Sequence, residues 1–239
     1  MDIELIGTGA IYSKYNNACT LINEDMIVDV PNGVLKQLLN LNCIPEKIDK
    51  ILITHMHGDH IADITFLLMY MYKAKEINRK TSIIGPIGIK NKVEQLFEVY
   101  DYHLLSKISE YIKFIELSPN EIIEDSEINY KIQAVSVLHG NEKPAYGYIV
   151  NENLGITGDT SLCEGVEYIM QNSKIIIADC SRINGDISHM GIDNLKYLTE
   201  KYKKQIFTTH VKDETREELI KLEISNISVE DDGFKIYNL

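Results

Sequence analysis

The feature that most constrains this chain is the segment THMHGDH, residues 54–60. It carries four potential metal ligands within six residues, namely His55, His57, Asp59 and His60. The apolar run KIDKILIT before it is typical of a buried strand, and HIADITFLLMYMYKAKE, which overlaps its end, is typical of a helix. Imidazole and carboxylate suit zinc and similar ions, and a turn after a strand can direct the first two histidines one way and the last two ligands another. The segment therefore predicts two neighbouring metal sites.

The remaining pattern predicts strands and helices in both halves of the chain. We expect strands at 2–5, 19–23, 26–30, 47–54, 81–85, 112–117, 128–138, 145–150, 154–159 and 174–180, and helices at 31–42, 60–76, 88–105 and 163–171. A helix, a strand, a helix and a terminal strand complete the chain. Two β-rich halves that each carry helices indicate two packed sheets with helices on both outer faces, and no composition change marks a linker. We therefore predict a single domain over 1–239.

Composition and charge limit the class of protein. Apolar residues make up 44% and charged residues 25%, as in an ordinary globular protein. The start MDIELIGTGA carries two acids where a signal peptide is basic, and no apolar stretch is long enough to span a membrane, so we expect a cytoplasmic location without membrane contact. The four cysteines form no CxxC pair, which predicts reduced and mostly buried thiols. A net charge of −12 disfavours nucleic-acid phosphates without excluding them.

The motif THMHGDH resembles the HxHxDH signature of the metallo-β-lactamase superfamily, which binds two metal ions. This resemblance implies an α+β fold, a four-layer αββα sandwich, in which later strand ends supply a further histidine, a bridging acid and a last histidine. His139 in SVLHGN, Asp159 in ITGDTS and His210 in FTTHVK follow in that order. The resemblance assigns one metal to His55, His57 and His139, the other to Asp59, His60 and His210, and the bridge to Asp159. Asp59 would also orient the nucleophile.

Alternatives remain open for individual ligands. Asp159 follows Gly158 and could simply form a turn, and His210 at a strand end carries a similar alternative. His103 is the one histidine outside the family-like positions, and we interpret it as an ordinary helix residue. The loop Gly7-Thr8-Gly9 could line the active site or serve as a structural turn.

Three segments are similar to the ribonuclease Z-like branch of the superfamily, which cleaves phosphodiesters. They are the N-terminal IGTGA, HGNEKPAYGYIV around His139, and DISHMG. In that branch a histidine in a motif like SHMG contacts the scissile phosphate and helps to protonate the leaving oxygen, which here implies His189. An imidazole with an ordinary pKa of about 6.5 can donate a proton near neutral pH. The competing interpretation is a helix-capping segment in which His189 is idle.

One departure from that branch bears on the substrate. Only 20 positions separate His139 from Asp159, so the tRNA-gripping arm that ribonuclease Z enzymes insert there is absent. With the acidic net charge, this favours a small-molecule or short nucleotide substrate, such as a cyclic nucleotide, over folded tRNA. We expect two divalent metal ions, zinc first and manganese or iron as alternatives.

Other functions on the same scaffold stay open at this point. A carboxylic ester, thioester or lactone hydrolase is the main alternative, because a dinuclear site attacks carbonyl carbon as readily as phosphorus. A sensor that kept its ligands and lost turnover is a third. The apolar segment ITFLLMYMY could line a substrate entrance, form a homodimer contact or be a buried helix. Asp179 could support ligand histidines, and Cys180 is interpreted as a packed thiol.

Overall fold

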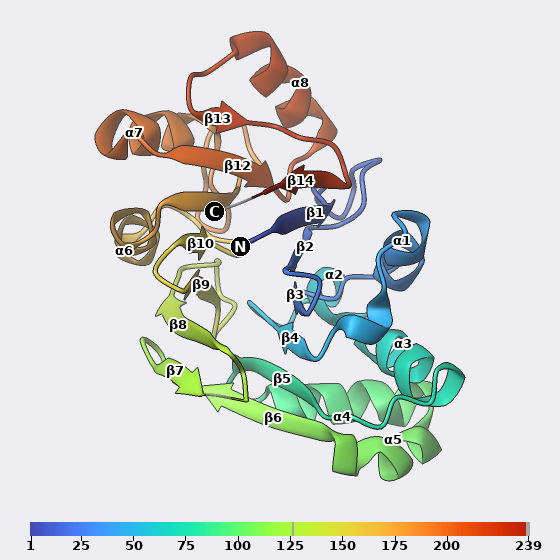
Figure 1. Ribbon diagram of the computed structural model, residues 1–239. Helices are drawn as coiled ribbons and strands as arrows, with labels where there is room; N and C mark the ends of the chain where they lie inside the picture. The colour runs from blue at the N-terminus through green and yellow to red at the C-terminus, as the bar shows by residue number, and fades with distance from the viewer. Residues whose placement is uncertain (126, 238–239) are drawn as a thin grey trace. The chain divides into compact units, whose positions relative to one another are not determined.

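The computed structural model of the chain describes residues 1–125 and 127–237 (Figure 1). These residues form two compact units that interleave along the sequence. The first unit contains residues 1–7, 17–117 and the C-terminal segment from Gly233, and the second contains residues 8–16 and 118–232. Within the described residues, no helix combines the length and apolar character needed to cross a membrane.

The first unit is built on a mixed seven-stranded sheet in the order β14-β1-β2-β3-β4-β5-β6. The strands are β1 (Ile3–Gly7), β2 (Cys19–Ile22), β3 (Met26–Val28), β4 (Lys50–Leu52), β5 (Thr81–Pro86), β6 (Ile112–Leu117) and β14 (Phe234–Ile236). β3, β4, β5 and β6 run parallel, and the other pairs are antiparallel. The parallel strands need crossover helices between them, and these helices cover one face of the sheet.

Those helices pack a core of branched aliphatic side chains against the sheet. They are α1 (Val34–Asn40), the 3₁₀ turn η1 (Pro45–Lys47), α2 (Gly58–Ile61), α3 (Ile64–Met69), the π-helix η2 (Tyr70–Ala74), α4 (Ile89–Tyr100), α5 (Tyr102–Ile108) and the 3₁₀ turn η3 (Ser109–Tyr111). Leu38, Ile64, Val93 and Phe97 are among the buried residues that meet Ile51 and Ile83 of the sheet. Burial of such side chains is the main force that holds the unit together.

The two long helices predicted in this unit are both divided. In the segment 60–76 the carbonyl of His60 accepts from the amide of Val30 at 2.7 Å, and the amide of Asp63 donates to the carbonyl of Val30 at 3.0 Å. These bonds to a neighbouring strand end take groups that a continuous helix would use, so α2 ends and α3 begins. In the segment 88–105 the break lies at Asp101, which leaves the helical conformation and caps α5 by accepting from the amide of Leu104.

The second unit is built on another mixed seven-stranded sheet, in the order β13-β12-β11-β10-β9-β8-β7. Its strands are β7 (Ile122–Asp125), β8 (Tyr130–Ser136), β9 (Tyr146–Val150), β10 (Leu154–Ile156), β11 (Ile175–Asp179), β12 (Gln205–Thr209) and β13 (Ile227–Ser228). β10 to β13 are parallel, and β7 to β10 are antiparallel. The helices α6 (Glu164–Asn172), α7 (Ile192–Tyr202) and α8 (Asp213–Leu222) pack with it around Val166, Ile176 and Leu195.

Two features of this unit were not predicted. Strand β7 has only four residues and lies in the acidic stretch EIIEDSE, where an alternating apolar pattern is too short to recognise. The single terminal strand expected from the sequence is instead two short strands, β13 in the second unit and β14 in the first. The remaining predicted strands and helices are present with boundaries shifted by a few residues.

Candidate metal centre

In the first unit the predicted ligands follow β4 directly. The backbone of β4 ends at Leu52, His57 precedes α2, and Asp59 and His60 lie in its short turn of helix. The Nε2 atom of His55 lies 3.0 Å from Nδ1 of His57, and Nε2 of His60 lies 3.7 Å from Oδ2 of Asp59. The rings of His55 and His60 also lie together, with centroids 4.1 Å apart, so the strand and the turn after it place the four side chains of the motif in one region.

A fifth residue of this group was missed by the sequence analysis. Asp29, just after β3, accepts from the amide and the hydroxyl of Thr54, each at 2.8 Å, and its Oδ2 lies 2.8 Å from Nδ1 of His60. This buried carboxylate fixes the ring of His60 and leaves its Nε2 atom on the side of Asp59. The sequence signal was weak, because a lone Asp before Pro31 is typical of an ordinary turn.

In the second unit three parallel strands bring their carboxyl ends to one edge. Asp159 follows β10, Asp179 is the last residue of β11, and His210 follows β12. The Nε2 atom of His210 lies 3.2 Å from Oδ2 of Asp159. The open edge at the ends of parallel strands is where α/β sheets place their sites. Asp159 follows Gly158, which has a positive φ of 60°, so the turn and the carboxylate contact coexist at this position.

His189 enters the same group from the loop between β11 and α7. Its Nδ1 atom lies 2.9 Å from Oδ2 of Asp179, and its ring stacks on that of His210 with centroids 5.0 Å apart. Burial alone would lower the pKa of His189, but the hydrogen bond and the charge of Asp179 outweigh it and raise that pKa. His189 is therefore held in this group by a buried carboxylate.

His139 lies beside His189 in the second unit. The Nδ1 atom of His139 is 2.7 Å from the carbonyl of Ser188, and the rings of His139 and His189 are edge to face with centroids 4.9 Å apart. Because the carbonyl can only accept, Nδ1 of His139 carries the hydrogen and Nε2 keeps its lone pair. An imidazole in this state is ready to bind a metal ion.

The donor atoms within each unit fit divalent metal binding. In the second unit the ligand atoms of four side chains lie within 4.8 Å of one another: Asp159, Asp179, His189 and His210. Two ligands of one tetrahedral zinc ion with bonds near 2.0–2.1 Å are about 3.3 Å apart. The 3.0 Å separation of His55 and His57 and the 3.2 Å separation of His210 and Asp159 are close to that value. The His and Asp clusters can therefore hold metal ions.

Two other sequence interpretations are answered by the structure. Cys180 is fully buried, and burial raises the pKa of its thiol well above the usual value, so it packs as expected. Thr8 of the GTG loop donates from both its amide and its hydroxyl to Asp232 and accepts from Arg216. These contacts hold the start of the loop in place, and a role in lining the active site stays a prediction.

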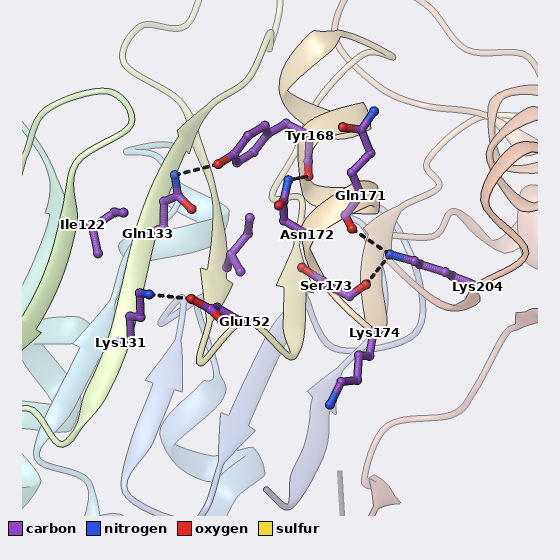
Figure 2. Close-up of a pocket in the computed structure, with 11 residues that line it drawn as sticks. Ile122, Lys131, Gln133, Glu152, Tyr168, Gln171, Asn172, Ser173, Lys174 and Lys204 are labelled. Carbon is purple, nitrogen blue, oxygen red and sulfur yellow. Dashed lines mark hydrogen bonds and ion pairs between the residues drawn. The ribbon is translucent and has the colours of Figure 1, made fainter.

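A polar pocket of about 440 Å³ in the second unit is separate from these clusters (Figure 2). Of the described residues that line it, none is a predicted ligand. Lys131 is paired with Glu152, and Lys204 donates to the carbonyls of Gln171 and Ser173 at the end of α6 (Figure 2). Because both amines already have hydrogen-bond partners, the pocket is a weaker candidate for a catalytic site than the histidine clusters.

A family model described as anti-Pycsar protein Apyc1 matches residues 1–228. The chain belongs to this family. Among curated relatives of this Apyc1-family chain, ribonuclease Z of Ligilactobacillus salivarius is 33% identical over 161 residues, covering 64% of the chain and 49% of the relative. Ribonuclease Z of Oceanobacillus iheyensis is 34% identical over 161 residues, covering 64% and 50%. The chain thus spans about half the length of the curated relatives it matches.

Solved structures similar to the Apyc1-family chain share its fold. A diphosphatase from the PhnP family matches with a TM-score of 0.79 and 19% identity, covering 100% of this chain and 98% of that one. The metallo-β-lactamase fold protein YhfI from Bacillus subtilis matches with 0.74 and 19%, covering 98% of each. Human tRNase Z, short form, matches with 0.74 and 19%, covering 99% of each. The predicted α+β metallo-β-lactamase fold and the ribonuclease Z-like resemblance are confirmed.

Proposed function

We propose that this chain is a metal-dependent hydrolase that cleaves a small or nucleotide-like phosphodiester. The observation that carries the proposal is the pairing of His189 with Asp179 beside Asp159 and His210, all within the second unit. A partly exposed imidazole that is held by a carboxylate next to candidate metal ligands can protonate a leaving oxygen during hydrolysis. The names of the relatives, ribonuclease Z and a diphosphatase, support phosphoester chemistry.

We further propose a dinuclear centre with the ligand sets that the signature and its order along the chain imply. One metal would take His55, His57 and His139, the other Asp59, His60 and His210, with Asp159 as the bridge. When bound, two divalent ions would supply Lewis-acid activation of water and of the phosphoryl group. Zinc suits this set of imidazoles and carboxylates best, with manganese and iron as the alternatives.

The side chains of the chain have separate roles in this proposal. Asp29 fixes the ring of His60, and the carbonyl of Ser188 fixes the ring of His139. Asp59 would orient the attacking water. Asp179 accepts the hydrogen of Nδ1 on His189, so Nε2 is the atom that would give a proton to the leaving oxygen. The rings of His60, His139 and His189 are thus each oriented by a neighbouring oxygen atom.

A small substrate is favoured over folded tRNA by the segment between His139 and Asp159. It consists of a turn, β9 and β10, which lie next to each other in the sheet, so it carries no protruding arm. The net charge of −12 also opposes a long polyanion. We propose a cytoplasmic enzyme. We also propose a homodimer, for which Phe66 and Tyr100, 40% and 49% exposed, are the candidate contact residues, and light scattering tests it.

Parallel assays of two model substrates test the proposed function. Metal-reconstituted protein would be assayed with bis(p-nitrophenyl) phosphate and with p-nitrophenyl acetate, beside a chelated sample and the His189→Ala variant. We expect metal-dependent cleavage of the diester. We expect His189→Ala to lose at least about 100-fold on a 3′,5′-cyclic nucleotide, whose alkoxide leaving oxygen needs a proton, and less on bis(p-nitrophenyl) phosphate, whose leaving group does not. His103→Ala is the matched control, because His103 is an exposed histidine on α5. Ester cleavage indifferent to His189 without diester turnover would instead identify a carbonyl hydrolase.

A further inference from the structure

Two loops of the second unit that are bonded to segments carrying candidate metal ligands present exposed apolar side chains. Tyr12 is 87% exposed and Ile187 is 79% exposed. Single exposed apolar residues are common on proteins, so exposure alone carries no weight. The position of these two residues is informative, because the backbone of each loop is bonded to a segment that holds a predicted ligand.

Tyr12 belongs to the loop 8–16, which is joined to the segment after β12. The amide of Ala10 donates to the carbonyl of Val211 at 3.2 Å, and the amide of Val211 donates to the carbonyl of Thr8 at 3.0 Å. Val211 directly follows His210. Two residues of chain span at most about 7 Å, so the Cα atom of Tyr12 lies within that distance of the Cα atom of Ala10, whose amide donates to Val211.

Ile187 belongs to the loop that carries His189, two residues further along the chain. Its carbonyl accepts from the amide of Gly140 at 3.0 Å, and Gly140 follows His139. The rings of His139, His189 and His210 are in successive contact, with centroids 4.9 and 5.0 Å apart. The Tyr12 loop is therefore bonded next to His210, and the Ile187 loop is bonded next to His139. Both histidines belong to the same cluster.

The base of the Tyr12 loop is held firmly. The guanidinium of Arg216, only 4% exposed, lies 3.8 Å from the centroid of the Tyr15 ring and donates to Thr8 at 2.6 Å. Asp213 accepts from the hydroxyl of Ser13 at 2.6 Å. These contacts position the loop before any ligand arrives, so a substrate that uses its tip loses little binding energy to loop ordering.

We propose that Tyr12 and Ile187 form a contact surface for the nucleobase of the substrate, here called the base platform. A phenol ring offers a stacking face and an aliphatic side chain offers apolar contact, and neither selects strongly among bases. This inference rests on the proposed phosphodiesterase function and narrows it to nucleotide diesters. Tyr12 and Ile187 are positioning residues in this view, and they take no part in proton transfer.

A comparison of two matched cyclic phosphates tests the base platform. The substrates are 3′,5′-cyclic nucleotides with purine or pyrimidine bases and the 3′,5′-cyclic phosphate of 1-methoxyribose, which has the same leaving group and no base. Stacking on an aromatic side chain is worth about 5- to 100-fold, so we expect wild-type kcat/KM to favour the nucleotides by a factor in that range. Tyr12→Ala should remove most of this preference through KM, and Tyr12→Phe should retain it.

Ile187→Ala should weaken the preference less than Tyr12→Ala, and Ile220→Ala is its control, because Ile220 is an exposed isoleucine on α8. Equal wild-type rates on both cyclic phosphates, or equal losses on both in Tyr12→Ala, would overturn the base platform and leave the phosphodiesterase intact. Cleavage of bis(p-nitrophenyl) phosphate alone would likewise overturn only the platform. Absence of metal-dependent cleavage of every diester would overturn the proposed function itself.

Discussion

The Nδ1 atom of His189 lies 2.9 Å from Oδ2 of Asp179, a carboxylate with no exposed surface. Asp179 also accepts from the amides of Thr160 and Ser181, at 3.1 and 3.0 Å. Burial raises the pKa of Asp179, while His189 opposes that rise. The carboxylate is thus fixed by backbone donors on two sides, and its remaining bond sets the orientation of the imidazole.

The Asp179→Asn variant tests the importance of this pair. An amide of the same shape cannot hold His189 by charge, and we expect kcat on a 3′,5′-cyclic nucleotide, whose leaving oxygen needs a proton, to fall about 10- to 100-fold. Metal content measured by mass spectrometry after reconstitution separates orientation of His189 from loss of ligands. Glu200→Gln on α7, an exposed change of the same chemistry, serves as the control. Unchanged kcat in Asp179→Asn would show that His189 acts without its carboxylate.

Metal removal should lower stability as well as activity. Stripping with a chelator leaves buried Asp159 and Asp179 near each other without a cation, and this mutual repulsion disfavours the folded state. At a metal concentration 100-fold above Kd the bound form gains about 2.7 kcal/mol, or roughly 5–10 °C in Tm for a chain of this size. Differential scanning fluorimetry with and without added zinc measures the shift.

The control for that experiment is a comparison of two histidine variants. His60→Ala removes a buried proposed ligand, and we expect its Tm to respond little to zinc. His103→Ala removes an exposed histidine outside both clusters and should respond like the wild type. A zinc-independent Tm in the wild type would contradict the proposed centre.

How far the sequence predicted the site depends on the kind of contact. The HxHxDH motif is local, so His55 to His60 could be placed at a strand end from their neighbours alone. Asp179 was suggested to support ligand histidines. Its carboxylate lies 2.9 Å from Nδ1 of His189 but 3.9 Å from Nδ1 of His210. The distance to His210 depends on the register of β11 and β12, which no local sequence pattern encodes. Asp29 was missed for the same reason, since its contact with His60 spans 31 residues.

The fold could be predicted where periodicity was strong and not where tertiary bonds interrupt it. Segment 60–76 has a helical apolar pattern, but the bond between Val30 and His60 ends α2. The loop Gly7-Thr8-Gly9 was left open between two roles, because the attachment of Thr8 to Arg216 and Asp232 joins residues more than 200 positions apart. Such contacts are a property of the folded chain and have no signature in the sequence near Thr8.

Arg216 should be among the most stabilising residues of the second unit. Its Nη2 donates to Thr8 at 2.6 Å, its Nη1 donates to the carbonyl of Glu230 at 2.8 Å, and its plane covers Tyr15. Arg216→Ala leaves these buried groups without their partner, and we expect a loss of about 3 kcal/mol in the free energy of unfolding. Urea denaturation followed by circular dichroism measures it.

Two further variants separate charge from geometry at that position. Arg216→Lys keeps the charge but cannot bridge two acceptors with one planar group, so it should recover only part of the loss. Lys221→Ala on the exposed side of α8 should be close to neutral. An Arg216→Ala variant with the same urea midpoint of unfolding as the wild type would show that other contacts hold the loop 8–16.

Cys43 should be slow to alkylate at neutral and mildly basic pH. Burial first, and then the charge of Glu4, whose Oε2 lies 3.6 Å from the thiol, raise the pKa of Cys43 to about 12. At pH 8 only about one thiol in 10,000 is then ionised, and the thiolate is the reactive form. Iodoacetamide labelling with peptide mass spectrometry should show Cys43 reacting more slowly in the folded chain than in urea.

The pH dependence of Cys43 has a definite sign. The folded thiol stays protonated above its ordinary pKa of 9.0 whereas the unfolded thiol ionises, so this group lowers stability as the pH rises from about 9 to 12. Glu4→Gln removes the neighbouring charge and should speed labelling of Cys43 at pH 8 to 9. Rapid labelling in the wild type at pH 8, equal to that in urea, would contradict the raised pKa.

Two glycine substitutions should differ in their effect on stability, because Gly165 of α6 packs closely on β8 and Gly58 of α2 faces open space. A Cβ atom at Gly165 would lie 2.0 Å from the carbonyl oxygen of Ser136, a backbone atom that cannot rotate away. Gly165→Ala must push α6 off β8, and we expect a loss of about 3 kcal/mol in the free energy of unfolding.

A Cβ atom at Gly58, in the first turn of α2, meets no heavy atom within 4 Å, so Gly58→Ala should leave stability unchanged or raise it by about 0.5 kcal/mol. Urea titration of both variants decides between them, and equal midpoints would mean that α6 does not approach β8 as closely as the structure has it. Because Ser136 lies three residues before His139, diester cleavage by Gly165→Ala should also fall, while its Tyr12-dependent preference for nucleotides should persist.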